Sequence, residues 1–88
     1  MNILEKANEI TFLRIEEKER QYGPFKEGMQ RAAIIATELC GKEISSIDLT
    51  KCIIALKLSR ESYNHKFDNL LDVLSYVAIL NELSNEKI

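Results

Sequence analysis

The sequence predicts an all-α protein in which residues 1–88 form one compact domain of four helices. Apolar residues recur at intervals of three and four along most of the chain, which is the spacing of a helix face. No stretch shows the alternation of a half-buried strand, and only one proline and three glycines interrupt the pattern. A chain of 88 residues has no room for a second core, so a single domain follows.

The first two helices are expected on either side of a break at Tyr22-Gly23. The first begins near Ile3 and runs into a charged stretch at residues 16–20. Pro24 fits the first turn of the second helix, where its missing amide hydrogen is not needed, and Gly41 closes that helix. The residues at helical spacing are Ile3, Leu4, Ala7, Ile10 and Thr11 in the first helix, and Phe25, Met29, Ala32, Ala33, Ala36, Leu39 and Cys40 in the second.

The third helix is expected to begin at Ser45 and Ser46, whose hydroxyls can cap it, with Asp48 near its positive end. Its sequence is apolar on nearly every side, which predicts burial by several neighbours. Asn64 can cap the fourth helix. The apolar residues are Leu49, Cys52, Ile53, Ile54, Ala55, Leu56 and Leu58 in the third helix, and Phe67, Leu70, Leu71, Leu74, Val77 and Ala78 in the fourth.

The short connection between the third and fourth helices predicts that they form an antiparallel hairpin. The fourth helix carries a second apolar face of Val73, Tyr76, Ile79 and Leu80. A subunit interface is the economical explanation of that face. We therefore expect a homo-oligomeric helical bundle, which would also enlarge the small core of so short a chain.

Composition limits the classes of partner and the cellular location that we expect for this protein. A net charge of −2 argues against a nucleic-acid partner. The longest apolar run, residues 52–56, is too short to span a membrane, and the first residues become charged too early for a secretion signal. Cys40 and Cys52 lie in apolar sequence, which favours buried, reduced thiols over a disulfide. We expect a cytoplasmic protein.

The residues with the clearest chemical pattern are two cations and two carboxylates. Lys57 and Arg60 stand three apart near the end of the third helix, and Asp68 and Asp72 stand four apart at the start of the fourth. Both spacings place the paired side chains on one helix face. Folding the two helices back at residues 63 and 64 brings all four charges to one end of the hairpin.

Two interpretations of this cluster remain open from spacing alone. Arg60–Asp68 and Lys57–Asp72 can be interhelical ion pairs that fix the hairpin register. Alternatively, Asp68 and Asp72 hold Mg²⁺ while Lys57 and Arg60 bind phosphate oxygens. Tyr76 lies one turn beyond Asp72, where its hydroxyl could reach that carboxylate or its ring could fill an interface.

Three segments resemble small phage-encoded proteins of the MazG-like, all-α nucleotide pyrophosphohydrolase type. They are Arg20-Gln21-Tyr22-Gly23, residues 56–60 (Leu-Lys-Leu-Ser-Arg), and residues 66–76, which contain Asp68, Asp72 and Tyr76 in an Asp-x-x-x-Asp-x-x-x-Tyr pattern. Similar phage proteins carry an arginine before Tyr-Gly, a Lys-x-x-Arg pair and this acidic helix in the same order. The resemblance extends from about the first helix to residue 83.

The resemblance implies an obligate helical oligomer that binds a nucleoside triphosphate with Mg²⁺ and cleaves it between the α- and β-phosphates. By position, Asp68 and Asp72 correspond to metal ligands, and Lys57 and Arg60 to the basic residues near the phosphates. Arg20 and Tyr22 correspond to an element that lines the pocket. A phage origin would place the protein in the cytoplasm of the host cell.

The sequence departs from that family in one respect. Such enzymes carry Glu-x-x-Glu on an earlier helix, which supplies the other half of the metal shell. The second helix here has only Glu27 and Glu38, which are too far apart to act as that pair. Glu16 and Glu19 have the correct spacing, but their charge-dense surroundings favour a solvated face.

Three hypotheses therefore follow. The first is a nucleotide-binding protein that acts as a Mg²⁺-dependent pyrophosphohydrolase. The second is a protein that sequesters a nucleotide or a nucleotide-derived defence signal without turnover. The third is a structural or interaction module in which the charges only set the hairpin register.

Overall fold

The computed structural model describes residues 1–13 and 25–85, and this part of the chain is helical with no strand. α1 (Ile3–Asn8) continues into a π-helical turn, η1 (Glu9–Leu13). Three longer helices follow: α3 (Phe25–Cys40), α4 (Ser46–Tyr63) and α5 (Phe67–Asn85). The predicted all-α class is therefore confirmed. The predicted end of the first helix at Tyr22-Gly23, and Pro24, lie outside the described residues.

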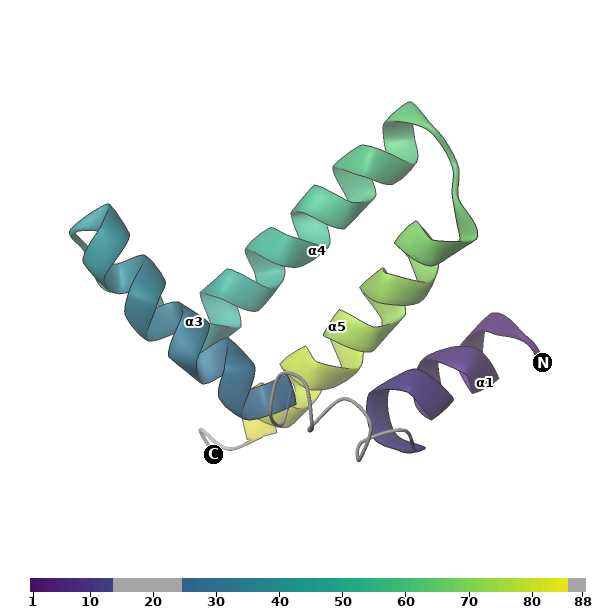
Figure 1. The fold of residues 1–88 in the computed structure, drawn as a ribbon, viewed down its shortest axis with the longest axis horizontal. Helices are drawn as coiled ribbons and strands as arrows, with labels where there is room; N and C mark the ends of the chain where they lie inside the picture. Colours follow the sequence, from purple (N-terminus) through teal and green to yellow (C-terminus); the bar gives the residue numbers. More distant parts are fainter. Residues whose placement is uncertain (14–24, 86–88) are drawn as a thin grey trace.

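α4 and α5 lie side by side and antiparallel, as the short connection predicts (Figure 1). α1 packs along α5, and α3 crosses near the start of α4 at one end of the hairpin. α5 is thus the central helix, because it contacts α1, α3 and α4. It also supplies most of the buried apolar side chains. Those in the described residues are Leu71, Ile79 and Leu83 from α5, Ala7 from α1 and Ala33 from α3.

Local hydrogen bonds explain where α4 begins. The Ser45 side chain accepts from the Asp48 amide at 3.0 Å, which is the predicted N-cap. Gly41 follows α3 with φ +71°, a left-handed conformation that glycine adopts without the Cβ penalty. Its amide donates to the Thr37 carbonyl oxygen at 3.0 Å. Both helix boundaries at the α3–α4 connection are therefore as predicted.

Thr37 holds this connection together through its side chain. Its hydroxyl donates to the Ala33 carbonyl oxygen at 2.8 Å and accepts from the Ile44 amide at 3.0 Å. These bonds join the last turns of α3 to the residue before the α4 cap. Thr50, which is fully buried, bonds back within α4 to the Ser46 carbonyl oxygen at 2.7 Å.

Several expectations about burial are wrong. α4 contacts only α3 and α5 within the described chain, so Leu56 and Leu58 are about half exposed. Cys40 and Cys52 are free thiols as expected, but both are exposed. Periodicity counts the apolar positions of a helix, whereas burial also depends on how many neighbours surround it.

The cap predicted at Asn64 is also wrong. Asn64 ends α4 as its C-cap, and its amide donates to the Arg60 carbonyl oxygen at 3.1 Å. The second apolar face of α5 is partly covered within the chain, since Ile79 is 4% exposed. That face therefore does not require a partner subunit to explain it. No helix in the described ranges combines the length and hydropathy needed to cross a membrane.

Replacing Thr37 by Val tests the α3–α4 connection. The substitution removes the only side-chain acceptor that the structure gives the part-buried Ile44 amide, so we expect a loss of about 1–3 kcal/mol in the free energy of unfolding. Chemical denaturation followed by circular dichroism measures this loss. Thr37→Ser keeps the hydroxyl and is the control, and equal losses in both variants would contradict the hydrogen-bond account.

Candidate functional site

The charged cluster lies where α4 and α5 run side by side before their connection at residues 64–66. Lys57 Nζ lies 3.1 Å from Asp72 Oδ2 across the two helices. The Lys57 side chain is 20% exposed and that of Asp72 is 42% exposed, so solvent reaches the pair. The Lys57–Asp72 ion pair, one of the two predicted from the hairpin count, is confirmed.

The second predicted ion pair is not formed. Arg60 and Asp68 are both exposed, and within the described residues no ion pair joins them. Arg60 lies about one turn beyond Lys57 toward the connection, and Asp68 lies one turn before Asp72. The cluster thus contains one closed pair and, nearer the connection, one cation and one carboxylate that are not joined to each other.

Tyr76 makes a contact that fixes its ring in the fold. Its ring lies 5.2 Å from that of Phe25, centroid to centroid, at an interplanar angle of 62°. This edge-to-face geometry is favourable for aromatic pairs and ties α5 to the first residue of α3. Of the two roles open from the sequence, the ring-packing role is the one with a contact in the structure.

The remaining predicted site residues, Arg20 and Tyr22, lie outside the described residues, as do Glu16 and Glu19. For the metal, the described ranges contain no group of three or more His, Cys, Asp or Glu side chains arranged to hold an ion. Asp68 and Asp72 supply two carboxylates, and Asp72 already faces a lysine ammonium. Mg²⁺ at these positions would need further oxygen ligands, which bound phosphates and water can provide.

Sequence reasoning missed the residue that organises the α4–α5 connection. The Glu61 carboxylate accepts hydrogen bonds from the Lys66 amide at 3.0 Å and from Asn69 Nδ2 at 3.4 Å. It also contacts Nδ1 of His65. The last turn of α4 thereby satisfies a backbone amide at the start of α5, a role that the sequence suggested for Asn64. The four-residue spacing of Glu61 and His65 on a helix end was the available signal.

These contacts lower the pKa of Glu61 below its ordinary value of 4.5. The hydrogen bond from the Lys66 amide is the main cause, and the His65 ring adds to it. Both contacts favour the charged form of the carboxylate.

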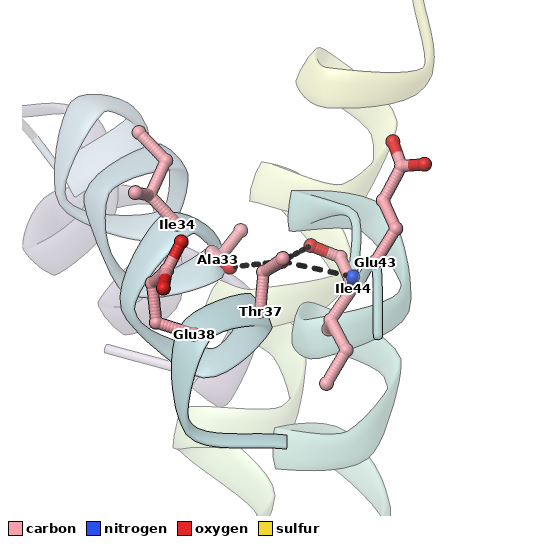
Figure 2. Close-up of a pocket in the computed structure, with 6 residues that line it drawn as sticks. All are labelled: Ala33, Ile34, Thr37, Glu38, Glu43 and Ile44. Atoms are coloured by element: carbon pink, nitrogen blue, oxygen red, sulfur yellow. Dashed lines mark hydrogen bonds between the residues drawn. The ribbon is translucent and has the colours of Figure 1, made fainter. Parts of the chain in front are cut away.

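A separate hollow of about 460 Å³ lies at the α3–α4 connection, and its lining includes none of the predicted site residues that the structure describes. Figure 2 shows Ile34 and Glu38 on the α3 side of the hollow and Glu43 on the opposite side. Ala33, Thr37 and Ile44 complete its lining. It therefore combines an apolar surface with two carboxylates, a lining that suits a cation with an apolar stem rather than a phosphate.

A family model described as a domain of unknown function (DUF6378) matches residues 2–84. The chain belongs to this family. Searches of the curated proteins and of the solved structures returned no match.

The DUF6378 match includes both helices of the charged hairpin. Lys57, Arg60, Asp68 and Asp72 therefore all belong to the family's domain rather than to an added segment. The match also includes all of α3, with the hollow beside it.

The pH dependence of stability tests the role of Glu61 in this DUF6378 chain. A carboxyl whose pKa is lower in the folded state contributes stability above its unfolded pKa and loses that contribution as pH falls through the folded pKa. We expect wild-type stability to decrease below about pH 4.5 more steeply than that of Glu61→Gln. Thermal melts between about pH 3 and pH 7 measure how steeply the stability of each protein changes with pH.

Glu82→Gln, at an exposed position of α5, is the matched control. It removes one carboxylate without touching the connection. If the Glu61 and Glu82 variants flatten the pH profile equally, the connection does not owe its stability to Glu61.

Proposed function

We propose that this protein binds a nucleotide through its phosphates at the α4–α5 hairpin, on the face that carries Lys57, Arg60, Asp68 and Asp72. The observation that carries the proposal is the 3.1 Å contact between Lys57 Nζ and Asp72 Oδ2. This contact sets the register in which basic positions of α4 stand beside acidic positions of α5. The three sequence segments that resemble MazG-like phage pyrophosphohydrolases support the same assignment.

The ion pair is a site that a ligand can open at low cost. Part-exposed pairs contribute about 0.2–1 kcal/mol, because solvent screens their attraction. Exchanging Asp72 for a phosphate oxygen would cost Lys57 little. Asp72 would then be free to face a cation. Arg60, which is exposed one turn further on, can bind a second phosphate oxygen through its planar fork.

Mg²⁺ is the proposed cofactor because a triphosphate brings both negative charge and oxygen ligands. Asp68 and Asp72 would approach the ion from one face of α5, and the phosphates and water would fill the remaining positions. Two carboxylates of one chain form an incomplete shell. This incompleteness, with the exposed apolar surface of the chain, supports the proposal that the protein acts as a homo-oligomer. The location that we propose is the cytoplasm, which is that of the host cell if the protein is phage-encoded.

The reaction we propose is hydrolysis between the α- and β-phosphates of a nucleoside triphosphate. A second candidate is sequestration without turnover, which the lack of a Glu-x-x-Glu pair on α3 favours. A purely structural role for the cluster is the third, and the Lys57–Asp72 ion pair is the observation in its favour. The two experiments below separate all three.

The first experiment measures binding by thermal shift with nucleoside triphosphates and cyclic nucleotides, with and without Mg²⁺. A ligand at a hundred times its dissociation constant stabilises by about 2.7 kcal/mol, which raises Tm by about 10–20 °C in a domain of this size. We expect Lys57→Ala to abolish the shift. Lys51→Ala, at an exposed position of the same helix, should leave it unchanged.

The structural alternative predicts a different pattern in that screen. No nucleotide would raise Tm, and Lys57→Met combined with Asp72→Leu would be tolerated or stabilising. That result would contradict nucleotide binding at the α4–α5 hairpin.

The second experiment distinguishes turnover from sequestration by chromatography of the recovered ligand. Accumulation of a nucleoside monophosphate and pyrophosphate over many turnovers indicates hydrolysis, whereas intact nucleotide in stoichiometric amount indicates sequestration. We expect Asp68→Asn and Asp72→Asn each to lower the turnover rate at least a hundredfold (about 10²) with helicity retained. Full turnover in both variants would show that the metal assignment is wrong.

A further inference from the structure

α3 has an outward side that the other described helices leave uncovered. We call Glu27, Arg31, Ile34, Ile35 and Glu38 the outer α3 face. At 100° per residue these five positions fall on one side of the helix, opposite the side of Ala33 and Met29. All five are exposed, with Ile34 at 67% and Ile35 at 59%, whereas Ala33 is 6% exposed. In Figure 1, α3 lies at the edge of the molecule, on the far side of α4 from α1.

Two adjacent isoleucines at the centre of an exposed face are costly to leave in water. Leu39, at 82% exposure, lies at the edge of the same face. Burying these three apolar side chains against a partner would remove apolar surface from water, which favours association.

The order of charges along α3 indicates what covers this face. In an antiparallel pairing of two copies centred between Ile34 and Ile35, each residue meets the one equally far from the centre. Ile34 then meets Ile35, and Arg31 meets Glu38. A parallel pairing would instead place each of these charges beside its own copy.

The hollow at the α3–α4 connection fits the same arrangement. Glu38 and the apolar side chain of Ile34 lie on its α3 side, and Glu43 and the apolar side chain of Ile44 lie on the opposite side (Figure 2). An arginine suits such a lining, because its aliphatic stem packs on apolar surface while its guanidinium binds carboxylates. In the antiparallel register, Arg31 of the second copy arrives opposite Glu38, at the edge of this hollow.

We propose that two copies of this chain associate through the outer α3 face. The copies run antiparallel about a two-fold axis between Ile34 and Ile35, and Arg31 of each copy binds at the hollow of the other. Such an interface is isologous, since the same surface is used twice. It gives a specific surface to the self-association proposed above. It does not rest on nucleotide binding.

Charge reversal in the two halves of the interface tests the proposal. In Arg31→Glu, residue 31 of each copy meets Glu38 of the other copy, so two pairs of glutamates face each other across the axis. In Glu38→Arg, two pairs of arginines face each other in the same way. We expect wild type to have a mass of about twice 10.1 kDa by light scattering after gel filtration, and each variant to run as a monomer. Mixing the two variants should restore the dimer, because every contact in the heterodimer then has opposite signs.

The matched controls reverse exposed charges elsewhere, with Lys51→Glu on α4 and Glu82→Arg on α5. Both should remain dimeric, alone and mixed. Ile34→Asp is a further variant, which should be monomeric and should not be rescued by mixing. Far-ultraviolet circular dichroism shows that each variant is folded, and the dimer recovered on mixing shows it independently for the two reversed chains.

The outcomes separate this inference from the nucleotide proposal. Monomeric wild type at high concentration would overturn self-association as a whole. A dimer that survives both reversals and Ile34→Asp would overturn the assignment to the outer α3 face alone. If either charge-reversed variant fails to fold, the oligomeric state of Ile34→Asp decides whether the outer α3 face is the interface. The nucleotide-dependent thermal shift is measured on the same samples, and its loss in Lys57→Ala with the dimer intact would show that the two sites are independent.

Discussion

The register of the α4–α5 hairpin is the constraint on which the rest of this structure depends. It is held at the connection by Glu61, whose carboxylate binds the Lys66 amide and Asn69. It is held further along by the ion pair of Lys57 and Asp72. Because side chains of α5 also form most of the core, a slip of one residue between the helices would misplace Leu71, Ile79 and Leu83 together. The same register determines which charges stand side by side, so fold and candidate site share one cause.

The second constraint is the small size of the core. Only five apolar side chains are buried within the described residues, and two of them are alanines. α5 has neighbours on several sides, whereas α4 and α3 are each open to solvent along one side. A single copy therefore leaves apolar residues exposed on all three of its long helices. Association of copies through α3 would relieve part of this exposure and leave the charged hairpin accessible.

The proposed site and the proposed interface lie at different junctions of the fold. The charges that we propose bind a phosphate are on the α4–α5 hairpin, and the hollow that we propose receives an arginine of a second copy is at the α3–α4 connection. Their linings are complementary in kind, since one offers lysine and arginine and the other offers two glutamates. α4 connects the two.

The sequence by itself determined the helices, the Ser45 cap, the glycine end of α3 and the approach of Lys57 to Asp72. Each of these follows from local hydrogen bonding or from counting residues across a short connection, and both are encoded within a few positions of the chain. Only the tertiary structure decided which faces are covered. It exposed Cys40, Cys52 and the outer α3 face, paired Tyr76 with Phe25, and left Arg60 and Asp68 unjoined to each other. It also gave Glu61 the role expected of Asn64, because the bonds of a side chain depend on the elements that surround it, and a periodic pattern does not specify its neighbours.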